Sequence, residues 1–177
     1  MNVAKDALNL SILSVFGHPK VFREIVQAYC ASLREVGSNP ANYSVAAGRH
    51  TLIHATDEEA QMAFAVYYER YLHHLRKELA YEPPESLGIE RPPKFQISPF
   101  AMRLYADIPL QQRIDEQTAC GSPETVAGKI VELHDTLGKL DAYWSVFDLG
   151  GCPTAEIIQS MELYAGKVRP RVERLIS

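Results

Sequence analysis

Three ionisable side chains stand at the ends of apolar stretches, where they could exchange protons with a ligand. They are His18 after residues 8–16, His54 near the end of 43–55, and Asp148 near the end of 143–149. Imidazole titrates near neutral pH, and a neighbouring carboxylate can orient it or share its proton. Two of them also have a structural explanation, since His18 precedes a helix-starting proline and Asp148 can accept hydrogen bonds from the glycine amides that follow it.

Other polar motifs in the chain predict less chemistry. Gly150 and Gly151 follow Asp148 and are candidates for close approach to a cofactor, but the chain contains no dinucleotide fingerprint. His50 and His54 have the spacing of a helical zinc pair. On a strand, however, four residues span about 13 Å, which is too far for one ion. We therefore expect no metal site.

The candidate residues require three strands whose carboxyl ends meet. The stretches 8–16, 43–55 and 143–149 are short and apolar, as parallel strands buried on both faces are. Helical periodicity separates them, which predicts βα units. The expected fold is therefore α/β with a parallel sheet, and ligands in such folds bind beyond the carboxyl ends of the strands.

Helix boundaries are marked clearly. Ser122 and Pro123 are typical of a helix start, and Gly138 is typical of its end. Pro19 opens an earlier helix. After Thr56, a capping-box pattern and acidic residues predict a long third helix, and we expect its inward positions to be those listed here: Ala60, Phe64, Tyr67, Tyr71, Leu75 and Leu79. We expect one further helix to close the chain.

Residues 80–118 contain six prolines and interrupt this pattern. So long a connection in a compact domain is either functional or disordered. The functional interpretation is a lid over the substrate, carrying Phe100, Arg103 and Tyr105. The alternative is a mobile insertion within a single domain that spans residues 1–177.

Composition excludes several classes of partner. The chain is 46% hydrophobic and 23% charged, with a formal net charge of −4 and no concentrated basic stripe, so we expect no nucleic-acid partner. It contains no apolar run long enough to cross a membrane. Three widely spaced cysteines without a CxxC motif predict a reducing, cytoplasmic setting.

Several segments resemble one enzyme family. The segments GSPETVAGKI, YWSVFDLGG and PTAEIIQSMELYAGKVRPRV resemble the C-terminal end of the bacterial luciferase-like, flavin-dependent monooxygenases, and GRHTLIHATDEEA, at 48–60, resembles the family's seventh strand. The resemblance implies a (β/α)8 barrel of which this chain holds about three strands, the sixth to the eighth.

The resemblance also implies a function. These proteins are oxidoreductases that use reduced FMN or a deazaflavin to activate oxygen or transfer hydride to or from a small molecule. Much of the family's flavin-binding equipment precedes the sixth strand, so this chain would need a partner half or an oligomer for activity. The alternative is a non-catalytic half-barrel, either a remnant or an assembly module, that does not bind flavin by itself.

A three-stranded piece of a barrel leaves an apolar face and two strand edges open. Exposing about 400 Å² of apolar surface would cost on the order of 10 kcal/mol, comparable to the stability of a whole domain. We expect a cover from one of three sources: a second copy, a complementary N-terminal half, or the insertion folded back. A homo-oligomer is our first choice if the chain, which begins with Met, is complete.

Overall fold

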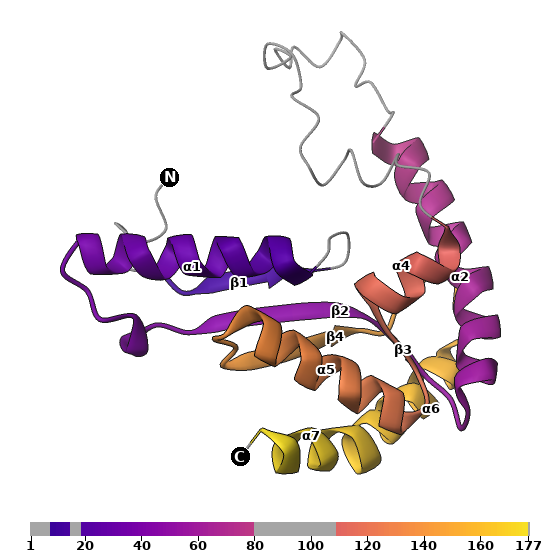
Figure 1. Cartoon of the computed structure of the whole chain (residues 1–177). Helices are drawn as coiled ribbons and strands as arrows, with labels where there is room; N and C mark the ends of the chain where they lie inside the picture. Colours follow the sequence, from indigo (N-terminus) through magenta and orange to yellow (C-terminus); the bar gives the residue numbers. More distant parts are fainter. Residues whose placement is uncertain (1–7, 15–18, 80–108, 177) are drawn as a thin grey trace, which may run out of the picture.

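Four parallel strands form one open sheet in the described part of the chain (Figure 1). The structure is a computed structural model that describes residues 8–14, 19–79 and 109–176. The strands are β1 (Leu10–Leu13), β2 (Val45–Ile53), β3 (Thr118–Gly121) and β4 (Ala142–Val146). The helices are α1 (Pro19–Glu35), α2 (Asp57–Leu79), α4 (Leu110–Gln117), α5 (Pro123–Leu137), α6 (Thr154–Leu163) and α7 (Arg169–Leu175), with a short 3-10 turn η1 (Pro40–Asn42) and a π-helical turn η3 (Tyr164–Val168).

The strand β2 pairs with every other strand of the sheet. Residues 45–48 pair with β1 and 46–50 pair with β4, so β1 and β4 lie on opposite edges of β2. Residues 50–53 pair with β3. The Asp141 carboxylate accepts a hydrogen bond from Val45 N at 2.8 Å and fixes the start of the β2–β4 pair. The predicted parallel sheet is confirmed, as an open part of a barrel.

Helix α5 begins and ends where the sequence predicts. The Ser122 side chain accepts from Thr125 N, Pro123 occupies the first turn, and Gly138 ends the helix in the left-handed conformation with φ of 71°. Glycine adopts that conformation at no steric cost, which explains the abrupt stop.

The outer face of the sheet, which carries Val45, Ala47 and Ile53 of β2, is covered by helices. Helix α1 contributes Val26 and Leu33 to one buried cluster there. Helix α5 and the C-terminal segment pack around Ile53 through a second cluster: Ala119, Val126, Ala127, Ile130 and Val168. Apolar burial on this face is what orders α1 and α5 against the sheet.

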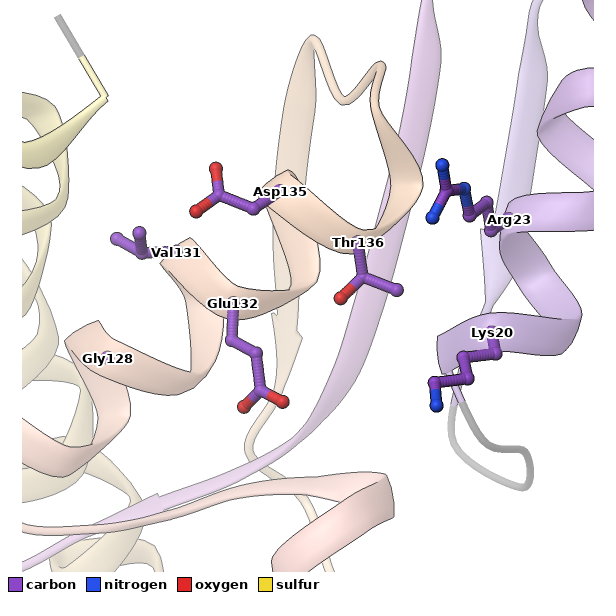
Figure 2. A pocket seen from close by; sticks show the side chains of 7 residues that line it. All are labelled: Lys20, Arg23, Gly128, Val131, Glu132, Asp135 and Thr136. Atoms are coloured by element: carbon purple, nitrogen blue, oxygen red, sulfur yellow. The ribbon is translucent and has the colours of Figure 1, made fainter.

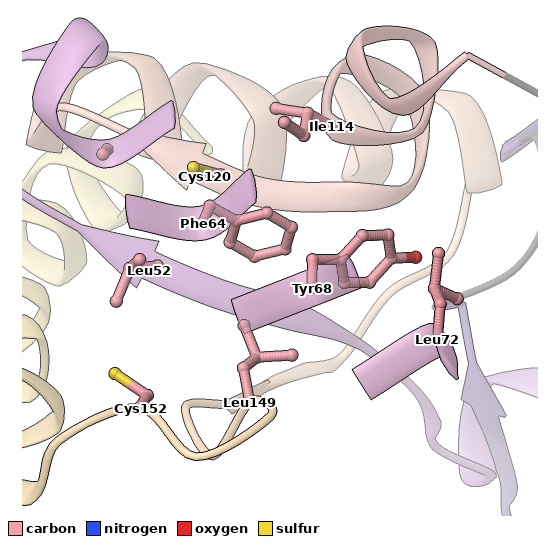
Figure 3. Close-up of a cluster of buried hydrophobic side chains, with 9 residues drawn as sticks. Leu52, Phe64, Tyr68, Leu72, Ile114, Cys120, Leu149 and Cys152 are labelled. Atoms are coloured by element: carbon pink, nitrogen blue, oxygen red, sulfur yellow. The ribbon is translucent and has the colours of Figure 1, made fainter. Parts of the chain in front are cut away.

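The inner face, which carries Gly48, His50 and Leu52 of β2, is covered only in part. At its C-terminal end, Phe64 and Tyr68 of α2 pack against Leu52 (Figure 3). Towards its N-terminal end, the half-buried Trp144 ring lies over Gly48, where a Cβ atom would collide with it. Helix α2 therefore covers part of the inner face. It was not among the covers expected from the sequence, which were a second copy, a complementary N-terminal half and the insertion.

Some sequence-based boundaries were wrong. On α2 the fully buried positions are Ala60, Phe64 and Tyr68, whereas Tyr67 and Tyr71 are only partly buried. The side chains of Leu75 and Leu79 lie outside the described part. The predicted closing helix is two helices joined by the π-helical turn η3, next to Pro170, whose ring and missing N–H disturb the preceding helical turn.

The predicted insertion falls mostly on residues outside the described part. Within its last residues, however, the chain forms α4 and the first residue of β3, so regular structure is present before residue 118. Strand β3 was not predicted, because four residues show no periodicity.

Candidate functional site

A carboxylate at the carboxyl ends of the strands joins two other polar side chains. Glu156 lies in the first turn of α6, His54 follows β2, and Tyr67 comes from α2. His54 Nε2 lies 2.8 Å from Glu156 Oε1, and the Tyr67 hydroxyl donates to Glu156 Oε2, also at 2.8 Å. We call His54, Tyr67 and Glu156 the rim cluster.

The position of α6 explains why these residues meet. Strand β4 stops pairing with β2 at His50, and beyond that point the Ser160 hydroxyl accepts the buried Ile53 N–H at 2.7 Å. Glu156 lies one helical turn before Ser160 on the same face of α6. The hydrogen bond at Ile53 therefore places Glu156 beside the next residue of the chain, His54.

The rim cluster is accessible to solvent and can exchange protons. The side chains of His54 and Glu156 are each 18% exposed. A carboxylate that accepts from a tyrosine and faces an imidazole can orient the ring. The neighbouring Cys152 is no nucleophile at neutral pH, since burial, assisted by the Glu156 carboxylate, raises the pKa of its thiol to about 11.

A second group of ring side chains lies on the inner face. His50 sits with its ring centroid 4.8 Å from that of Tyr71 and 6.0 Å from that of Tyr68. Burial lowers the pKa of His50 to about 4, so this imidazole is neutral at physiological pH. Arg113 of α4 is also buried. Burial raises the pKa of the Tyr68 hydroxyl, and the positive charge of Arg113 offsets only part of that rise. These rings fill the inner face beside β2.

The structure brings one of the predicted catalytic candidates into a cluster. His54 belongs to the rim cluster. Asp148 is exposed in the loop after β4, and no hydrogen bond joins it to His54 among the described residues. His18 lies outside the described residues, as do the lid candidates Phe100, Arg103 and Tyr105. Their roles stay predictions.

The two cofactor candidates differ in their surroundings. Gly150 packs against the α2 backbone at Tyr67, where a Cβ atom would collide with the carbonyl oxygen. Gly151 has open space where its Cβ would be. The close approach at Gly150 is therefore made to helix α2, whereas Gly151 faces open space.

Glu156 and Tyr67 were missed by sequence reasoning. An acidic residue in the first turn of a helix is explained by the helix dipole, and a tyrosine on an amphipathic helix by core packing. The one available signal was the position of Glu156 just after the glycine turn at the end of a strand, where ligands bind in α/β folds.

Asp57 connects two distant helix starts beside the rim. It begins α2, and its carboxylate accepts from Ser122 N at 2.6 Å and from the Thr125 hydroxyl at 2.9 Å, at the start of α5. A carboxylate at a helix N-terminus satisfies free N–H groups and complements the helix dipole. Asp57 therefore joins the TDEEA and GSPET segments.

We expect Asp57→Asn to lower the free energy of unfolding at pH 7 by about 1 kcal/mol. The amide cannot replace both acceptor oxygens, so the hydrogen bond from Thr125 is lost. The Ser122 N–H holds the pKa of Asp57 below its usual value, so the stabilisation is present above the unfolded-state pKa of about 4 and is lost as pH falls through the lower folded-state value.

Urea denaturation between pH 7 and pH 3 measures this effect. The difference in free energy of unfolding between the parent chain and Asp57→Asn should become smaller in acid. The control Glu58→Gln, at an exposed neighbouring position, should change that free energy little at any pH. A gap that stays constant down to pH 3 would contradict the role of the charge.

Two shallow grooves lie on the opposite side of the sheet from the ring side chains. The larger, of about 560 Å³, runs between α1 and α5 and is lined by Lys20 and Arg23 of α1 and by Glu132 and Asp135 of α5 (Figure 2). The smaller, of about 260 Å³, continues past Arg34. Both grooves are shallow and lined by charged side chains, of both signs in the larger groove and basic in the smaller, which makes them poor sites for a planar ring ligand.

The sequence comparison decides the family. Residues 3–139 match the luciferase-like monooxygenase family. This chain belongs to the luciferase-like monooxygenase family. The match ends before β4, so the family assignment rests on β1 to α5. No curated protein matches the chain in sequence.

Solved structures of similar fold extend the comparison to the C-terminal helices. Monooxygenase RslO1 from Streptomyces bottropensis matches 95% of this chain and 43% of its own, at 14% identity and a TM-score of 0.67. The oxygenating constituent of 3,6-diketocamphane monooxygenase from Pseudomonas putida, solved with FMN, matches 96% of this chain and 44% of its own, at 21% identity and a TM-score of 0.65. The coenzyme F420-dependent tetrahydromethanopterin reductase of Methanopyrus kandleri matches 96% of this chain and 47% of its own, at 20% identity and a TM-score of 0.56.

The chain thus spans less than half the length of each of these proteins. At such identities the likeness shows the fold alone. Among the described residues, no helix is long and apolar enough to cross a bilayer, and no three His, Cys, Asp or Glu side chains come close enough to hold a metal ion.

The described residues do not form a complete flavin site. The N-terminus of α5 is occupied by the Asp57 carboxylate and carries Glu124, so it repels rather than binds a phosphate. The inner face around His50 is filled by Tyr68 and Tyr71. A flavin would need protein groups beyond those described.

Proposed function

We propose that this chain is the C-terminal part of a luciferase-like flavin-dependent monooxygenase or related oxidoreductase. The strands that it lacks would complete both the barrel and the site for reduced FMN or a deazaflavin. The observation that carries the proposal is the open parallel sheet of a family member that spans less than half the length of its solved neighbours. We propose a cytoplasmic location, with a small molecule as substrate.

The rim cluster would then contribute proton transfer at the edge of the site. His54 is held by Glu156, and Glu156 by Tyr67, so the imidazole is oriented before a substrate arrives. His18, Asp148, Gly150 and Gly151 remain proposed contributors at the same rim, and residues 80–118 a proposed lid. Bound flavin would supply the redox chemistry, while this chain would orient groups and exclude water.

A second function is favoured by one observation. Tyr68 and Tyr71 close the inner face beside His50, which lets the half-barrel bury that part of its core without any cofactor. A scaffold or assembly module that never binds flavin would have this property. Once the missing strands are supplied, the enzyme should bind FMN and the scaffold should not.

Trp144 offers a direct test. It is the chain's single tryptophan and lies half-buried on the inner face, so its fluorescence should shift to shorter wavelength when that face is covered. The probe is a fusion to Met1 of the part of the diketocamphane protein that this chain does not match. We expect the isolated chain to leave FMN fluorescence unchanged at micromolar concentration, and the fusion to shift Trp144 emission and quench FMN.

The remaining outcomes separate the two functions. A fusion that shifts Trp144 emission without binding FMN would favour the scaffold. Micromolar FMN binding by the isolated chain would contradict the need for more strands. In the fusion, Glu156→Gln should lower turnover more than FMN affinity, with Gln159→Ala, at an exposed position on the same helix, as the matched control.

A further inference from the structure

An arginine is buried on the outer face of the sheet without a counter-charge. Arg49 of β2 is only 3% exposed, and its Nε–H is fully buried with no hydrogen-bond partner. Among the described residues, its guanidinium forms no ion pair, and its carbonyl oxygen alone accepts from a side chain, the Thr51 hydroxyl at 3.2 Å. A buried charge is costly unless it is paired and hydrogen-bonded.

Two hydroxyl groups beside Arg49 are also buried and unpaired. They are Tyr143 Oη and Ser145 Oγ of β4. Ser145 is the cross-strand partner of Arg49, and Tyr143 that of Ala47, so all these side chains point to the outer face. Burial raises the pKa of Tyr143 to about 12, and the Arg49 charge and the Ser145 hydroxyl offset part of the rise, so the three groups lie close together. We call Arg49, Tyr143 and Ser145 the outer polar cluster.

Three unpaired polar atoms on neighbouring strands indicate an occupant. Native proteins leave few buried polar atoms unsatisfied, and ordered water or an ion usually completes those that remain. Burial lowers the pKa of Arg49, but a guanidinium stays protonated in proteins, so the positive charge persists. Water would accept the hydrogen bonds and leave that charge uncompensated. An anion would do both.

The larger groove, between α1 and α5, lies near the outer polar cluster. Glu132 lines this groove, and its charge acts on the pKa of Arg49, so the groove is within electrostatic reach of the guanidinium. Gly128 also lines the groove and has open space where its Cβ would be. The Glu132 side chain is exposed to solvent and forms no ion pair with Arg49. A small ion could therefore approach from this side.

We propose that the outer polar cluster binds one small monovalent anion, with chloride as the natural ligand. The Arg49 Nε–H and the hydroxyls of Tyr143 and Ser145 donate to it. One negative charge matches the one positive charge, whereas a divalent anion such as sulfate would leave a net charge buried. Strands β2 and β4 supply every donor, so the site is independent of the proposed function.

Urea denaturation of the whole chain, followed by circular dichroism, tests the site. Sodium chloride replaces sodium fluoride at constant total concentration, so the screening of surface charges stays fixed. Fluoride holds its water more strongly than chloride and should bind poorly in a buried site. When chloride reaches ten times its dissociation constant, the ratio of folded to unfolded chain should rise about elevenfold, because only the folded state binds it. The rise should saturate, and bromide should act at lower concentrations than chloride.

Substitutions at the cluster separate binding from general salt effects. Arg49→Met keeps an unbranched side chain and removes the charge, so it should abolish the dependence on chloride. In fluoride it should be at least as stable as the parent chain, since the unpaired buried charge is gone. Arg34→Met, at an exposed position on α1, is the matched control and should keep the full chloride dependence.

A second variant keeps the test decisive if Arg49→Met does not fold. Tyr143→Phe removes one donor and keeps the ring and the charge of Arg49. A hydrogen bond to a charged group contributes enough that its loss should raise the dissociation constant for chloride about tenfold or more. In fluoride, the same substitution should not lower the unfolding midpoint, because the hydroxyl that it removes is unpaired.

Three results would overturn the proposal. They are an unfolding midpoint that stays unchanged when chloride replaces fluoride, a change that never saturates, and a chloride dependence that survives both Arg49→Met and Tyr143→Phe. In the first case, ordered water satisfies the cluster. The FMN titration is read separately, so failure of the fusion to bind FMN would count against the proposed function and leave this inference standing.

Discussion

Gly150→Ala is expected to lower the free energy of unfolding by about 2 to 5 kcal/mol. Gly150 has φ of 45°, a left-handed conformation that costs about 1 to 2 kcal/mol for alanine. The new methyl group would also collide with the backbone of α2 at Tyr67, and such overpacking adds about 1 to 3 kcal/mol. Backbone atoms cannot rotate away as a side chain can, so α2 must shift on the sheet.

The adjacent glycine separates these two contributions. Gly151 has φ of 80° and open space at its Cβ position, so Gly151→Ala should lose only the conformational part. Urea denaturation followed by Trp144 fluorescence measures both variants. Equal losses would show that α2 does not press on the loop at Gly150.

Phe64→Ala is expected to lower the free energy of unfolding by about 3 to 5 kcal/mol. Phe64 is fully buried in one cluster with Leu52 of β2 and Leu149 of the loop after β4, and its ring centroid lies 4.9 Å from that of Tyr68. The cavity would open where α2 meets the inner face of the sheet. The loss of stability therefore measures how much the packing of α2 on that face contributes.

Met62→Ala on the same helix is the matched control. Met62 is 68% exposed, and its truncation should change stability by less than about 0.5 kcal/mol. Thermal and urea unfolding should agree for both variants. If Phe64→Ala costs no more than Met62→Ala, α2 is not packed on the sheet in solution.

Local sequence signals predicted the helices that end in clear caps and the strands that carry the core. Ser122, Pro123 and Gly138 bound α5 as expected, because capping depends on neighbouring residues alone. The face of α2 was not predictable in the same way. Tyr67 and Tyr68 are adjacent, and a stripe through either residue fits helical spacing, so only the packing against Leu52 decides between them.

Long-range contacts explain what remained hidden in the site. His54 was a candidate because it ends a strand, but its partner Glu156 lies about a hundred residues further along the chain. No local pattern relates the two. Their meeting depends on where β4 stops pairing and on the Ser160 hydroxyl taking over at Ile53, which are properties of the assembled sheet.

The pairing of β2 with all other strands has a consequence for synthesis on the ribosome. Of the described strands, β1 alone precedes β2, whereas β3 and β4 emerge much later, so one edge of β2 stays open while most of the chain is being made. Such non-local pairings form slowly and expose aggregation-prone edges in the meantime. We expect nascent chains that end before β4 to require chaperones, and synonymous codon changes that slow translation between α2 and β4 to lower the soluble yield.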